Sequence, residues 1–451
     1  MTHHEMAHAR RRAELAGAMQ SSGALSGAPL GLGKRSSNLF RDRRETDKRR
    51  LDLSAFCHVL DIDTTGGWVD VEGLTSYEAL VAQTLPHGVM PAVVPQLKTI
   101  TVGGAAAGVG IEATSHRQGL VHDTLLALDV LLPDGEVVHC TPDNAFRDLF
   151  FGFPNSYGTL GYALRLRLRT LPVKPFVKVE HMPFDAPGAF FSALAAQCQG
   201  DADFVDGVVF GAQQQVINQA CFVDAAPWLS DYSFENIYYR SLLDRPVDYL
   251  TVQDYLWRWD TDWFWCSKNL YAQRPLVRRL LGRRRLNSRT YTQVMRWNAR
   301  WGVTRRLARW RGSFTESVIQ DVDIPIAGAS DFLVFLLREI GILPVWICPV
   351  RGPVPGAKFT LYPMAADSLY VNFGFWDVVE TTRAFEPGHF NRLVEREVMR
   401  LGGIKSLYSD SYFTPEEFEQ AYGLSHYQVL KAKYDPAGRM LGLFEKCVLR
   451  A

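Results

Sequence analysis

Cysteine is scarce in this sequence, and the few residues are scattered. The seven cysteines stand at positions 57, 140, 198, 221, 266, 348 and 447, and no two form a C-x-x-C pair. An odd, dispersed set is typical of a reducing compartment and argues against a disulfide framework or a structural zinc site. The sequence also lacks an apolar run of the roughly 18 to 20 residues that a membrane span needs. We therefore expect a cytoplasmic protein without metal, at most peripheral on the inner membrane face.

The N-terminal residues lack the apolar core of a signal peptide. They do contain His4-Glu5-Met6-Ala7-His8, which matches the zinc-protease pattern H-E-x-x-H. A chain terminus frays readily and offers no packed scaffold to hold a metal. We therefore interpret residues 1–21 as an N-terminal tail or helix without a catalytic role.

Neither sign of charge is in excess over the whole chain, which carries a net charge of +1. The exception is the segment 274–311, which holds 13 arginines and no Asp, Glu, Lys or His, so the rest of the chain carries 1 − 13 = −12. Leucine and tryptophan are interleaved with these arginines, and a helix here would have an apolar stripe and an arginine face. This pattern favours a helix on an anionic membrane surface. A solvated face paired with the acidic remainder is the second interpretation, and nucleic acid is the third.

Glycine and alanine are concentrated after residue 101, where residues 101–113 contain four of each. Glycine lets backbone approach a ligand closely, and successive N–H groups form an anion cradle. The run predicts a site for a phosphate-bearing cofactor, although a tight turn between strands is the alternative. A second glycine turn, 154–161, precedes the alternating strand 162–169. Further alternation predicts hairpins over 58–72 and 125–138 and a helix over 76–84.

Five motifs follow one another in a fixed order. They are P-x-L-x-x-I-T-V-G-G from Pro95, S-H-x-x-G-L from Ser115, L-x-D-G-x-V-x-x-C-T-P from Leu132, D-L-F at 148–150 and G-T-L-G from Gly158. Together they resemble the PCMH-type FAD-binding domain of the vanillyl-alcohol-oxidase superfamily. Beyond that domain the sequence is similar to the sterol delta-24 reductases and the bacterial methylene-fatty-acyl reductases.

The resemblance implies an α+β fold in four parts. Residues 1–21 are the tail or helix, and 22–173 form the PCMH-type FAD-binding domain. Residues 174–405 form an α+β substrate or cap domain that includes the arginine-rich segment. Residues 406–451 are a C-terminal segment that returns to the flavin.

FAD is expected to bind noncovalently, because the loop 28–41 has neither the His nor the Cys that could bond to flavin. For Lys34 and Arg35 a solvated basic loop is the alternative to phosphate binding. The residues that the resemblance implies in FAD binding are Lys34, Arg35, Ser36, Ser37, Asn38, Thr101, Val102, Gly103, Gly104, Gly108, Gly110, Ser115, Tyr157, Gly158, Thr159 and Gly161.

The resemblance further implies an NADPH-driven reduction of an isolated C=C bond in a lipid, either a methylene-branched fatty acyl chain or a sterol side chain. Such an alkene has no carbonyl to polarise it, so an acid must protonate one carbon while reduced FAD supplies hydride to the other. Burial near a lipid would raise the pKa of a carboxyl for this task. The candidate acids are Glu112 and Asp410, followed by His116, Tyr408 and Tyr412. Core packing is the alternative for the two tyrosines.

Two other functions stay open. One is an FAD-dependent oxidase or dehydrogenase of an alcohol or a sugar-lipid hydroxyl. The decaprenylphosphoryl-ribose oxidases carry a Lys before the Asp of the C-terminal motif, whereas Ser409 precedes Asp410 here, which weighs against a sugar oxidase. The other is a membrane-associated scaffold without flavin. The sequence leaves the oligomeric state undetermined.

Overall fold

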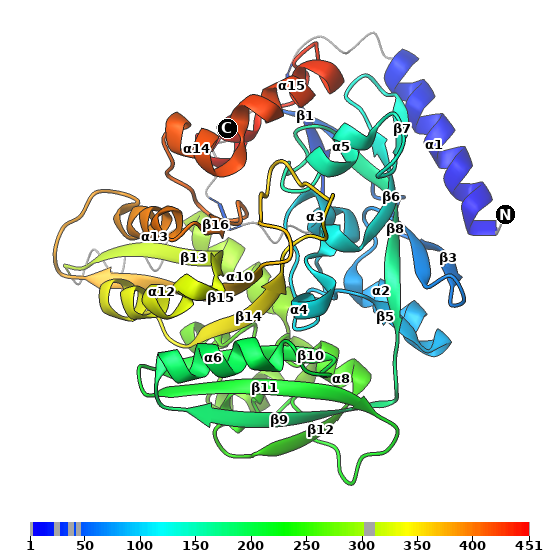
Figure 1. Cartoon of the computed structure of the whole chain (residues 1–451). Helices are drawn as coiled ribbons and strands as arrows, with labels where there is room; N and C mark the ends of the chain where they lie inside the picture. Colours follow the sequence, from blue (N-terminus) through cyan, green and yellow to red (C-terminus); the bar gives the residue numbers. More distant parts are fainter. Residues whose placement is uncertain (1–2, 22–27, 35–39, 42–46, 302–311, 451) are drawn as a thin grey trace.

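The computed structural model describes residues 3–21, 28–34, 40–41, 47–301 and 312–450 (Figure 1). Two large β-sheets organise these residues, beside one small sheet of two strands. The first sheet uses strands between residues 59 and 172, and the second uses strands between residues 176 and 405. The predicted boundary at 173 falls between the last strand of the first sheet and the first strand of the second. The α+β class expected from the sequence is confirmed.

The long strand β8 (Tyr162–Pro172) is the centre of the first sheet, whose order is β3-β4-β8-β6-β7 with β5 paired to the end of β8. Alternate leucines of β8 are buried, whereas Arg165 and Arg167 on the other face bond the buried Asp70 of β4. The period-two pattern of the sequence thus sets which face of the sheet is core. The other strands of this half are β1 (Leu30–Gly33), β2 (Arg49–Asp52), β3 (Val59–Asp63), β4 (Trp68–Glu72), β5 (Val89–Pro91), β6 (Leu125–Leu131) and β7 (Val137–Cys140).

The helix α1 (His3–Ser21) is fixed to the first sheet. Its His8 Nδ1 lies 2.7 Å from Glu72 Oε1, and Arg11 Nη2 donates to the same oxygen at 2.5 Å. The expectation that this terminus frays is therefore wrong for residues 3–21, because a buried carboxyl binds two of its side chains. The second histidine of the H-E-x-x-H match is engaged in this ion pair.

The glycine-rich stretch contains two short helices, α3 (Val102–Ala107) and α4 (Ser115–Gln118). Thr101 caps α3, since its Oγ1 accepts from Gly104 N at 3.3 Å. The predicted helix over 76–84 is α2 (Tyr77–Thr84), which Ser76 caps through a hydrogen bond from Ala79 N. A hydroxyl that accepts from the third residue of a helix satisfies one of its free donors. The remaining helix of this half is α5 (Arg147–Gly152).

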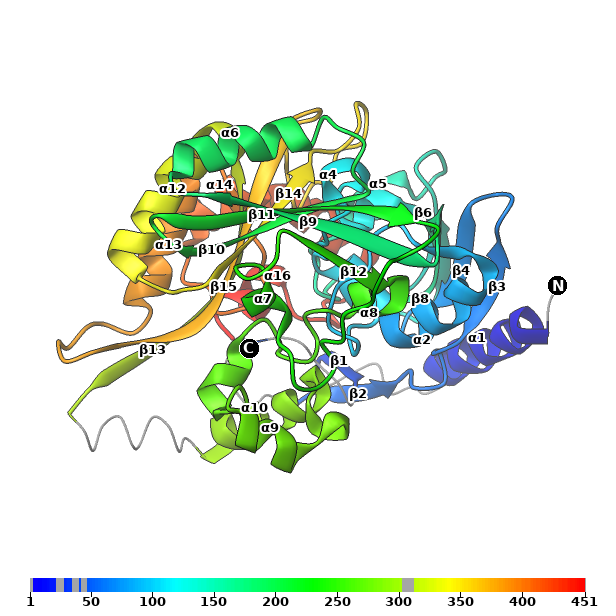
Figure 2. The ribbon, with the colours of Figure 1, turned by 90° about the horizontal axis from the view of Figure 1, so that it is seen from below.

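The second sheet is antiparallel, in the order β12-β9-β11-β10-β14-β15-β13-β16. The helices α6 (Pro187–Gln197), α12 (Ala329–Phe335) and α13 (His389–Arg400) cover its outer face (Figure 2). Its strands are β9 (Phe176–Phe184), β10 (Phe204–Gly211), β11 (Gln214–Val223), β12 (Val247–Thr251), β13 (Phe314–Pro325), β14 (Val345–Arg351), β15 (Leu369–Thr381) and β16 (Ile404–Lys405).

Alternation in β13 gives the two faces of this sheet different roles. Val318, Val322 and Ile324 pack into the core beneath the helices. Ile319 and Asp321 point to the opposite face, toward the first half of the molecule. The second sheet therefore carries an apolar core on one side and a functional surface on the other.

The C-terminal helices return to the first half, as Figure 1 shows. Lys433 Nζ pairs with Asp148 on α5 at 2.6 Å, and Lys446 Nζ donates to Tyr157 O at 2.6 Å. These helices are α14 (Pro415–Tyr422), α15 (Leu424–Tyr434) and α16 (Leu443–Cys447).

The arginine-rich segment differs from the single amphipathic helix that its spacing suggested. It forms α9 (Pro275–Leu281), the short turn 283–285 and α10 (Ser288–Trp301), and Gly282, with a φ of 68°, separates the first two. Residues 302–311 lie outside the described residues. The small helices α7 (Tyr238–Ser241) and α8 (Val252–Leu256) precede this segment.

All seven cysteines are free thiols. Among the described residues, no helix combines the length and the apolar character required to cross a bilayer.

Candidate functional site

A cavity of about 540 Å³ lies between the two halves of the molecule. The first half contributes α3, the turn that precedes β8, and the strands β1 and β2. The second half contributes the inner face of β13 and β15, together with the loop that contains Trp263 and Phe264. Most of the lining is apolar, so the cavity suits an aromatic cofactor and a hydrocarbon substrate better than a polar metabolite.

Glycines form one wall of the cavity because side chains would not fit there. A Cβ on Gly103 would lie 2.8 Å from Gly73 O, and one on Gly110 would lie 2.6 Å from Val121 Cγ2. Gly161 has a φ of 142°, which other residues rarely adopt. The backbone itself therefore faces the cavity at these positions.

The amides of the Gly103-Gly104 pair already have partners within the chain. Gly103 N donates to Gly73 O at 2.8 Å, and Gly104 N donates to Thr101 Oγ1 at 3.3 Å. These two glycines therefore let the backbone approach a ligand closely, but their amides are already used in hydrogen bonds within the chain.

Cationic side chains gather where β1 and β2 border the cavity. Lys34, Lys48 and Arg50 come from this side, and Lys446 comes from α16. Lys34 Nζ donates to Thr101 Oγ1 at 2.8 Å, which places an ammonium group beside the glycine wall. Positive charge next to closely approachable backbone fits the pyrophosphate of a dinucleotide.

A cluster of three polar side chains lines the opposite wall: Asp321 on β13, Trp376 on β15 and Tyr408 after β16. Trp376 Nε1 donates to Tyr408 Oη at 2.7 Å, and both side chains stand near enough to Asp321 to influence the pKa of its carboxyl. The carboxyl oxygen Oδ1 has no hydrogen-bond partner among the described residues. The cluster thus places a carboxyl without an ion-pair partner on a mostly apolar wall, whereas the other carboxyl of the lining, Asp377, pairs with Lys268 at 2.7 Å.

Burial raises the pKa of Asp321 to about 7, and the charge of Asp323 two residues along the strand adds to the increase. The polar hydrogens of the neighbouring Tyr408 and Trp376 oppose this shift because they favour the carboxylate. Burial also raises the pKa of Asp323 to about 6. That side chain is bonded to Tyr362 and Asn372 and does not line the cavity.

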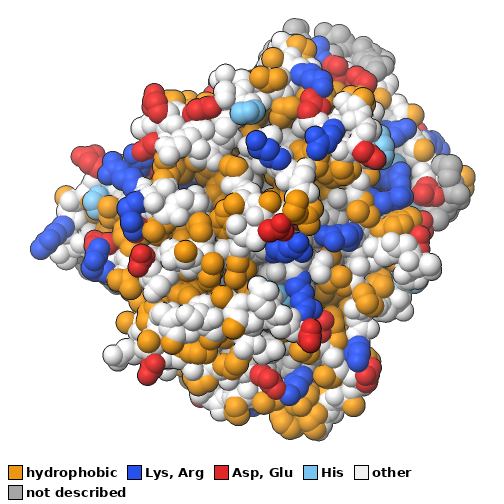
Figure 3. Space-filling model, in the orientation of Figure 1, with side chains coloured by type: hydrophobic (Ala, Val, Ile, Leu, Met, Phe, Trp, Pro, Cys, Tyr) orange, Lys and Arg blue, Asp and Glu red, His pale blue; other side chains and the backbone are white. Residues whose placement is uncertain are grey.

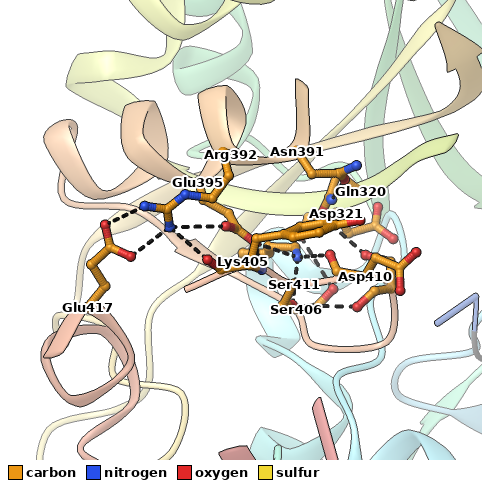
Figure 4. A network of polar contacts seen from close by, with 12 residues as sticks. Gln320, Asp321, Asn391, Arg392, Glu395, Lys405, Ser406, Asp410, Ser411 and Glu417 are labelled. Atoms are coloured by element: carbon orange, nitrogen blue, oxygen red, sulfur yellow. Dashed lines mark hydrogen bonds and ion pairs between the residues drawn. The ribbon is translucent and has the colours of Figure 1, made fainter. Parts of the chain in front are cut away.

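A second polar network holds the segment that carries Tyr408 in place (Figure 4). The buried Lys405 Nζ lies 3.2 Å from Glu395 of α13 and donates to Ser411 Oγ at 2.8 Å. Arg392 of α13 binds both oxygens of Glu417, at 2.6 and 2.9 Å. These bonds tie residues 404–417 to α13, so Tyr408 is held over the cavity by contacts on its far side.

The structure brings together ten of the residues predicted from the sequence. The predicted residues that line the cavity are Lys34, Thr101, Gly103, Gly104, Gly108, Gly110, Tyr157, Gly158, Gly161 and Tyr408. The predicted residues that do not line it are Val102, Ser115, Thr159, Glu112, His116, Asp410 and Tyr412. Arg35, Ser36, Ser37 and Asn38 lie outside the described residues.

Glu112, the first candidate acid, is buried in an ion-paired cluster. Its Oε1 accepts from Arg258 Nη2 at 2.9 Å, and the same nitrogen donates to Asp206 at 2.7 Å. Burial raises the pKa of Glu112 to about 7, while Arg258 opposes the shift. Glu112 belongs to the first half of the molecule and Arg258 and Asp206 to the second, so this ion-paired cluster links the two halves.

The other candidates are also engaged in contacts within the chain. His116 Nδ1 lies 2.9 Å from Ala113 O, and burial lowers the pKa of its ring. Asp410 lies 3.6 Å from Arg450, whose guanidinium covers the ring of Tyr412 at 4.9 Å.

Sequence reasoning missed Asp321 and Trp376. A signal was present, because Asp321 and Asp323 alternate with Val322 and Ile324 and therefore share one face of the strand. Two carboxyl groups on the same face of a buried strand require either partners or a function.

Comparison with known proteins agrees with this geometry. The family described as "FAD binding domain" matches residues 7–141. Delta(24)-sterol reductase of Homo sapiens is 26% identical over 398 residues, covering 83% of this chain and 73% of the relative. Delta(24)-sterol reductase of Pisum sativum is 25% identical over 448 residues, covering 88% and 76%. The chain is an FAD-binding oxidoreductase related to the sterol delta-24 reductases.

This flavoprotein shares a shorter region with another relative. Decaprenylphosphoryl-beta-D-ribose oxidase of Mycolicibacterium smegmatis is 31% identical over 125 residues, which is 28% of this chain and 27% of the relative. The predicted superfamily and the PCMH-type α+β fold are confirmed. The glycine wall and the cationic rim of the cavity fit the cofactor that the matched domain binds.

Proposed function

We propose that this flavoprotein is an NADPH-dependent reductase of an isolated C=C bond in a lipid, with FAD bound noncovalently in the cavity. The observation that carries the proposal is the Asp321 carboxyl, which lines a mostly apolar cavity on the wall opposite the glycines. The likeness to sterol reductases over most of the chain supports it. A methylene-branched fatty acyl chain is the favoured substrate, and a sterol side chain is the other. The proposal includes a cytoplasmic location, where NADPH and free thiols are kept reduced.

The residues that would hold FAD lie on the first half. The backbone at Gly103, Gly104 and Gly161 would approach the cofactor closely, and Lys34 would neutralise phosphate charge. When bound and reduced by NADPH, the flavin supplies a hydride to one carbon of the alkene.

Asp321 would supply the proton for the other carbon. With a pKa of about 7, its carboxyl retains a proton near neutral pH and can give it up. The polar hydrogens of Tyr408 and Trp376 would stabilise the carboxylate that remains, and this effect favours proton release. A branched alkene protonated at its less substituted carbon develops positive charge at the tertiary carbon, where hydride then adds. NADPH and one proton are consumed for each alkane formed.

An alcohol oxidase is the alternative, and the relative from Mycolicibacterium smegmatis is an oxidase by name. Alcohol oxidation requires a base to accept the hydroxyl proton. A carboxyl with a pKa of about 7 is about half protonated near neutral pH, so Asp321 can accept that proton as well as donate one. The preference for reduction therefore rests on the similarity to sterol reductases over most of the chain.

Anaerobic half-reactions test the function directly. NADPH should bleach the flavin absorbance of the oxidised protein, and a methylene-branched phospholipid should restore it without oxygen. An alcohol oxidase would stay yellow with NADPH, bleach with its alcohol and regain colour with oxygen. Failure of both NADPH and NADH to bleach a fully loaded protein would overturn the reductase proposal.

The acid is tested in the same two half-reactions. Asp321→Asn keeps the shape of the side chain, so bleaching by NADPH should be nearly unchanged. Flavin reoxidation by the alkene should slow by about 100-fold or more, since general acids typically contribute 10²–10⁴-fold. Asp323→Asn is the control, because it removes a carboxyl that does not line the cavity; it should lower the pKa of Asp321 but leave that acid in place. Glu112→Gln and Asp410→Asn test the sequence-based candidates. If one of them alone blocks reoxidation, the acid is there and not at Asp321.

A further inference from the structure

The helices α9 and α10 and the turn 283–285 form a lobe at one side of the ribbon (Figure 2), and several of its apolar side chains are exposed. On α9, Leu276 is 74% exposed and Leu280 is 82% exposed. They stand four residues apart and therefore share one face of the helix. On α10, Val294 and Trp297 are exposed as well, at 38% and 57%. Large apolar side chains gathered on one lobe mark an interaction surface.

The inner side of this lobe is packed, so the outward residues are not a sign of poor folding. Leu286 and Tyr291 are buried against Trp263, and Tyr291 Oη donates to Thr261 O at 2.8 Å. Arg278 is also buried, paired with Asp262 at 2.5 Å. The lobe thus presents a fixed apolar edge.

Four arginines of the lobe have acidic partners in the chain. The pairs are Arg278 with Asp262, Arg279 with Glu235, Arg283 with Asp231 and Arg289 with Glu78. This pairing with the acidic remainder uses only part of the positive charge. Arg284 and Arg285 are exposed and have no side-chain partner among the described residues. On the face drawn in Figure 3, by contrast, acidic and basic side chains are interspersed.

We infer that this lobe is a docking surface for an anionic lipid bilayer. Leu276, Leu280 and Trp297 would enter the interface, and Arg284 and Arg285 would contact the headgroups. The exposed leucines suit the hydrocarbon core of a bilayer, and the arginines without acidic partners suit its anionic headgroups. A nucleic acid would satisfy the arginines and leave the leucines in water, so a bilayer fits both features better.

The lobe also borders the cavity. Met295 of α10 lines the cavity while its neighbours Val294 and Trp297 face solvent. The loop before α9 contributes Trp263, Phe264 and Cys266 to the same lining. A lipid tail that leaves the bilayer beside α10 reaches the cavity past Met295. This delivery step rests on the proposed function, whereas bilayer binding does not.

Vesicle flotation of the full-length flavoprotein tests the surface. Vesicles of phosphatidylglycerol and phosphatidylcholine should bind it, and phosphatidylcholine alone should bind it far less. Arg284→Gln/Arg285→Gln should weaken binding by roughly fivefold for each arginine. Leu276→Ser/Leu280→Ser should weaken it by about tenfold or more. Added salt should weaken the wild-type interaction, because exposed charges are screened.

Matched controls separate the lobe from general charge and apolarity. Arg338→Gln/Arg383→Gln removes two exposed arginines from the second half, and Val429→Ser removes an exposed apolar side chain from α15. Both should bind vesicles like the wild type, and every variant should keep its flavin absorbance. Equal binding to neutral and anionic vesicles would overturn the inference. So would binding of an oligonucleotide that depends on Arg284 and Arg285, with no binding to vesicles.

Turnover distinguishes delivery from chemistry. The two lobe variants should reduce alkene lipid more slowly when it is presented in vesicles, and at the wild-type rate when it is dispersed in detergent. Bleaching by NADPH should not change. If the wild type reduces no lipid in either form yet still binds anionic vesicles, the proposed function fails and the docking surface stands.

Discussion

Gly374 of β15 lies directly opposite Asp321 of β13 in the antiparallel register of the second sheet. A Cβ on Gly374 would lie 2.8 Å from Asp321 Oδ1 and 2.5 Å from Trp376 Cη2. Because Gly374 has no side chain, the Asp321 carboxyl and the Trp376 indole both fit on this face of the sheet. A glycine inside a long strand weakens it, so this one is best explained by what it accommodates.

Gly374→Ala should displace Asp321 and Trp376 and so impair the cavity wall. Inserting a methyl group into a packed space typically costs about 1–3 kcal/mol. We expect a lower melting temperature, retained flavin, and slower flavin reoxidation by the alkene lipid in stopped-flow measurements. Gly211→Ala is the control, since a Cβ at the end of β10 meets nothing within 4 Å. Wild-type reoxidation in Gly374→Ala would show that this glycine does not set the acid's position.

The raised pKa of Asp321 predicts a pH-dependent stability difference between the wild type and Asp321→Asn. The pKa rises from 3.8 to about 7 on folding, so between these values the folded state binds a proton that the unfolded state has lost. The wild type therefore loses stability relative to the variant as pH rises from about 4 to about 7, and the difference is constant above that range.

Thermal unfolding of both proteins from pH 4.5 to 8.5 measures this difference. The melting temperature of Asp321→Asn should rise relative to that of the wild type across the interval and then remain parallel to it. The rate of alkene reduction by the wild type should fall as the pH rises through about 7, because Asp321 then loses the proton that it would donate. A difference that does not change with pH would show that the Asp321 carboxyl is ionised throughout.

The sequence predicted the first half of the molecule well because its signals are local. Alternation indicated the strands now seen as β3, β4, β6, β7 and β8, and Ser76 marked the start of α2. The glycine positions of the cavity wall were also identified, since close backbone approach requires glycine whatever the distant surroundings. Each of these features depends on residues within one element or one turn.

The second half of the site was harder to predict because it depends on register between distant strands. Asp321 faces the cavity only because β13 pairs with β15 and directs its valines toward the helices. Glu112 illustrates the opposite case, since its partner Arg258 is 146 residues away. Local sequence cannot say whether a buried carboxyl will meet an arginine or an open cavity.

Gly104→Val tests the predicted flavin wall. A Cβ on Gly104 would lie 2.8 Å from Thr101 Oγ1 and 3.4 Å from Lys34 Nζ, at the edge of the cavity. The branched side chain should occupy ligand space, so we expect loss of flavin absorbance while the circular dichroism of the fold remains. Gly188→Val at the start of α6 is the control, because a Cβ there meets nothing within 4 Å. Full FAD occupancy in Gly104→Val would contradict the placement.

The mode of FAD attachment can be read from the wild type. Acid precipitation should release the yellow colour into the supernatant, because the described part of the loop before β2 presents no histidine or cysteine to the cavity. Colour that stays with the precipitate would indicate a covalent bond.

Glu72 is expected to hold α1 on the first sheet. Its carboxyl accepts from His8 and Arg11 on the helix, and from the ring and the backbone of His58 at 2.8 and 3.0 Å. These hydrogen bonds lower its pKa to about 2 against the opposing effect of burial. The stabilisation is therefore complete above the unfolded pKa of 4.5 and is lost as pH falls toward 2.

Glu72→Gln should loosen the helix, because the amide cannot reproduce charge-assisted bonds to His8 and Arg11. We expect a loss of about 1–3 kcal/mol in the free energy of unfolding at neutral pH. Hydrogen exchange over residues 3–21 should accelerate, while flavin is retained. The control is Glu14→Gln, whose exposed pair with Arg10 lies within the same helix and is screened by solvent, so its loss should change the stability far less. Unchanged protection of α1 in Glu72→Gln would mean that apolar contacts such as that of the buried Met19 hold the helix, and not this carboxyl.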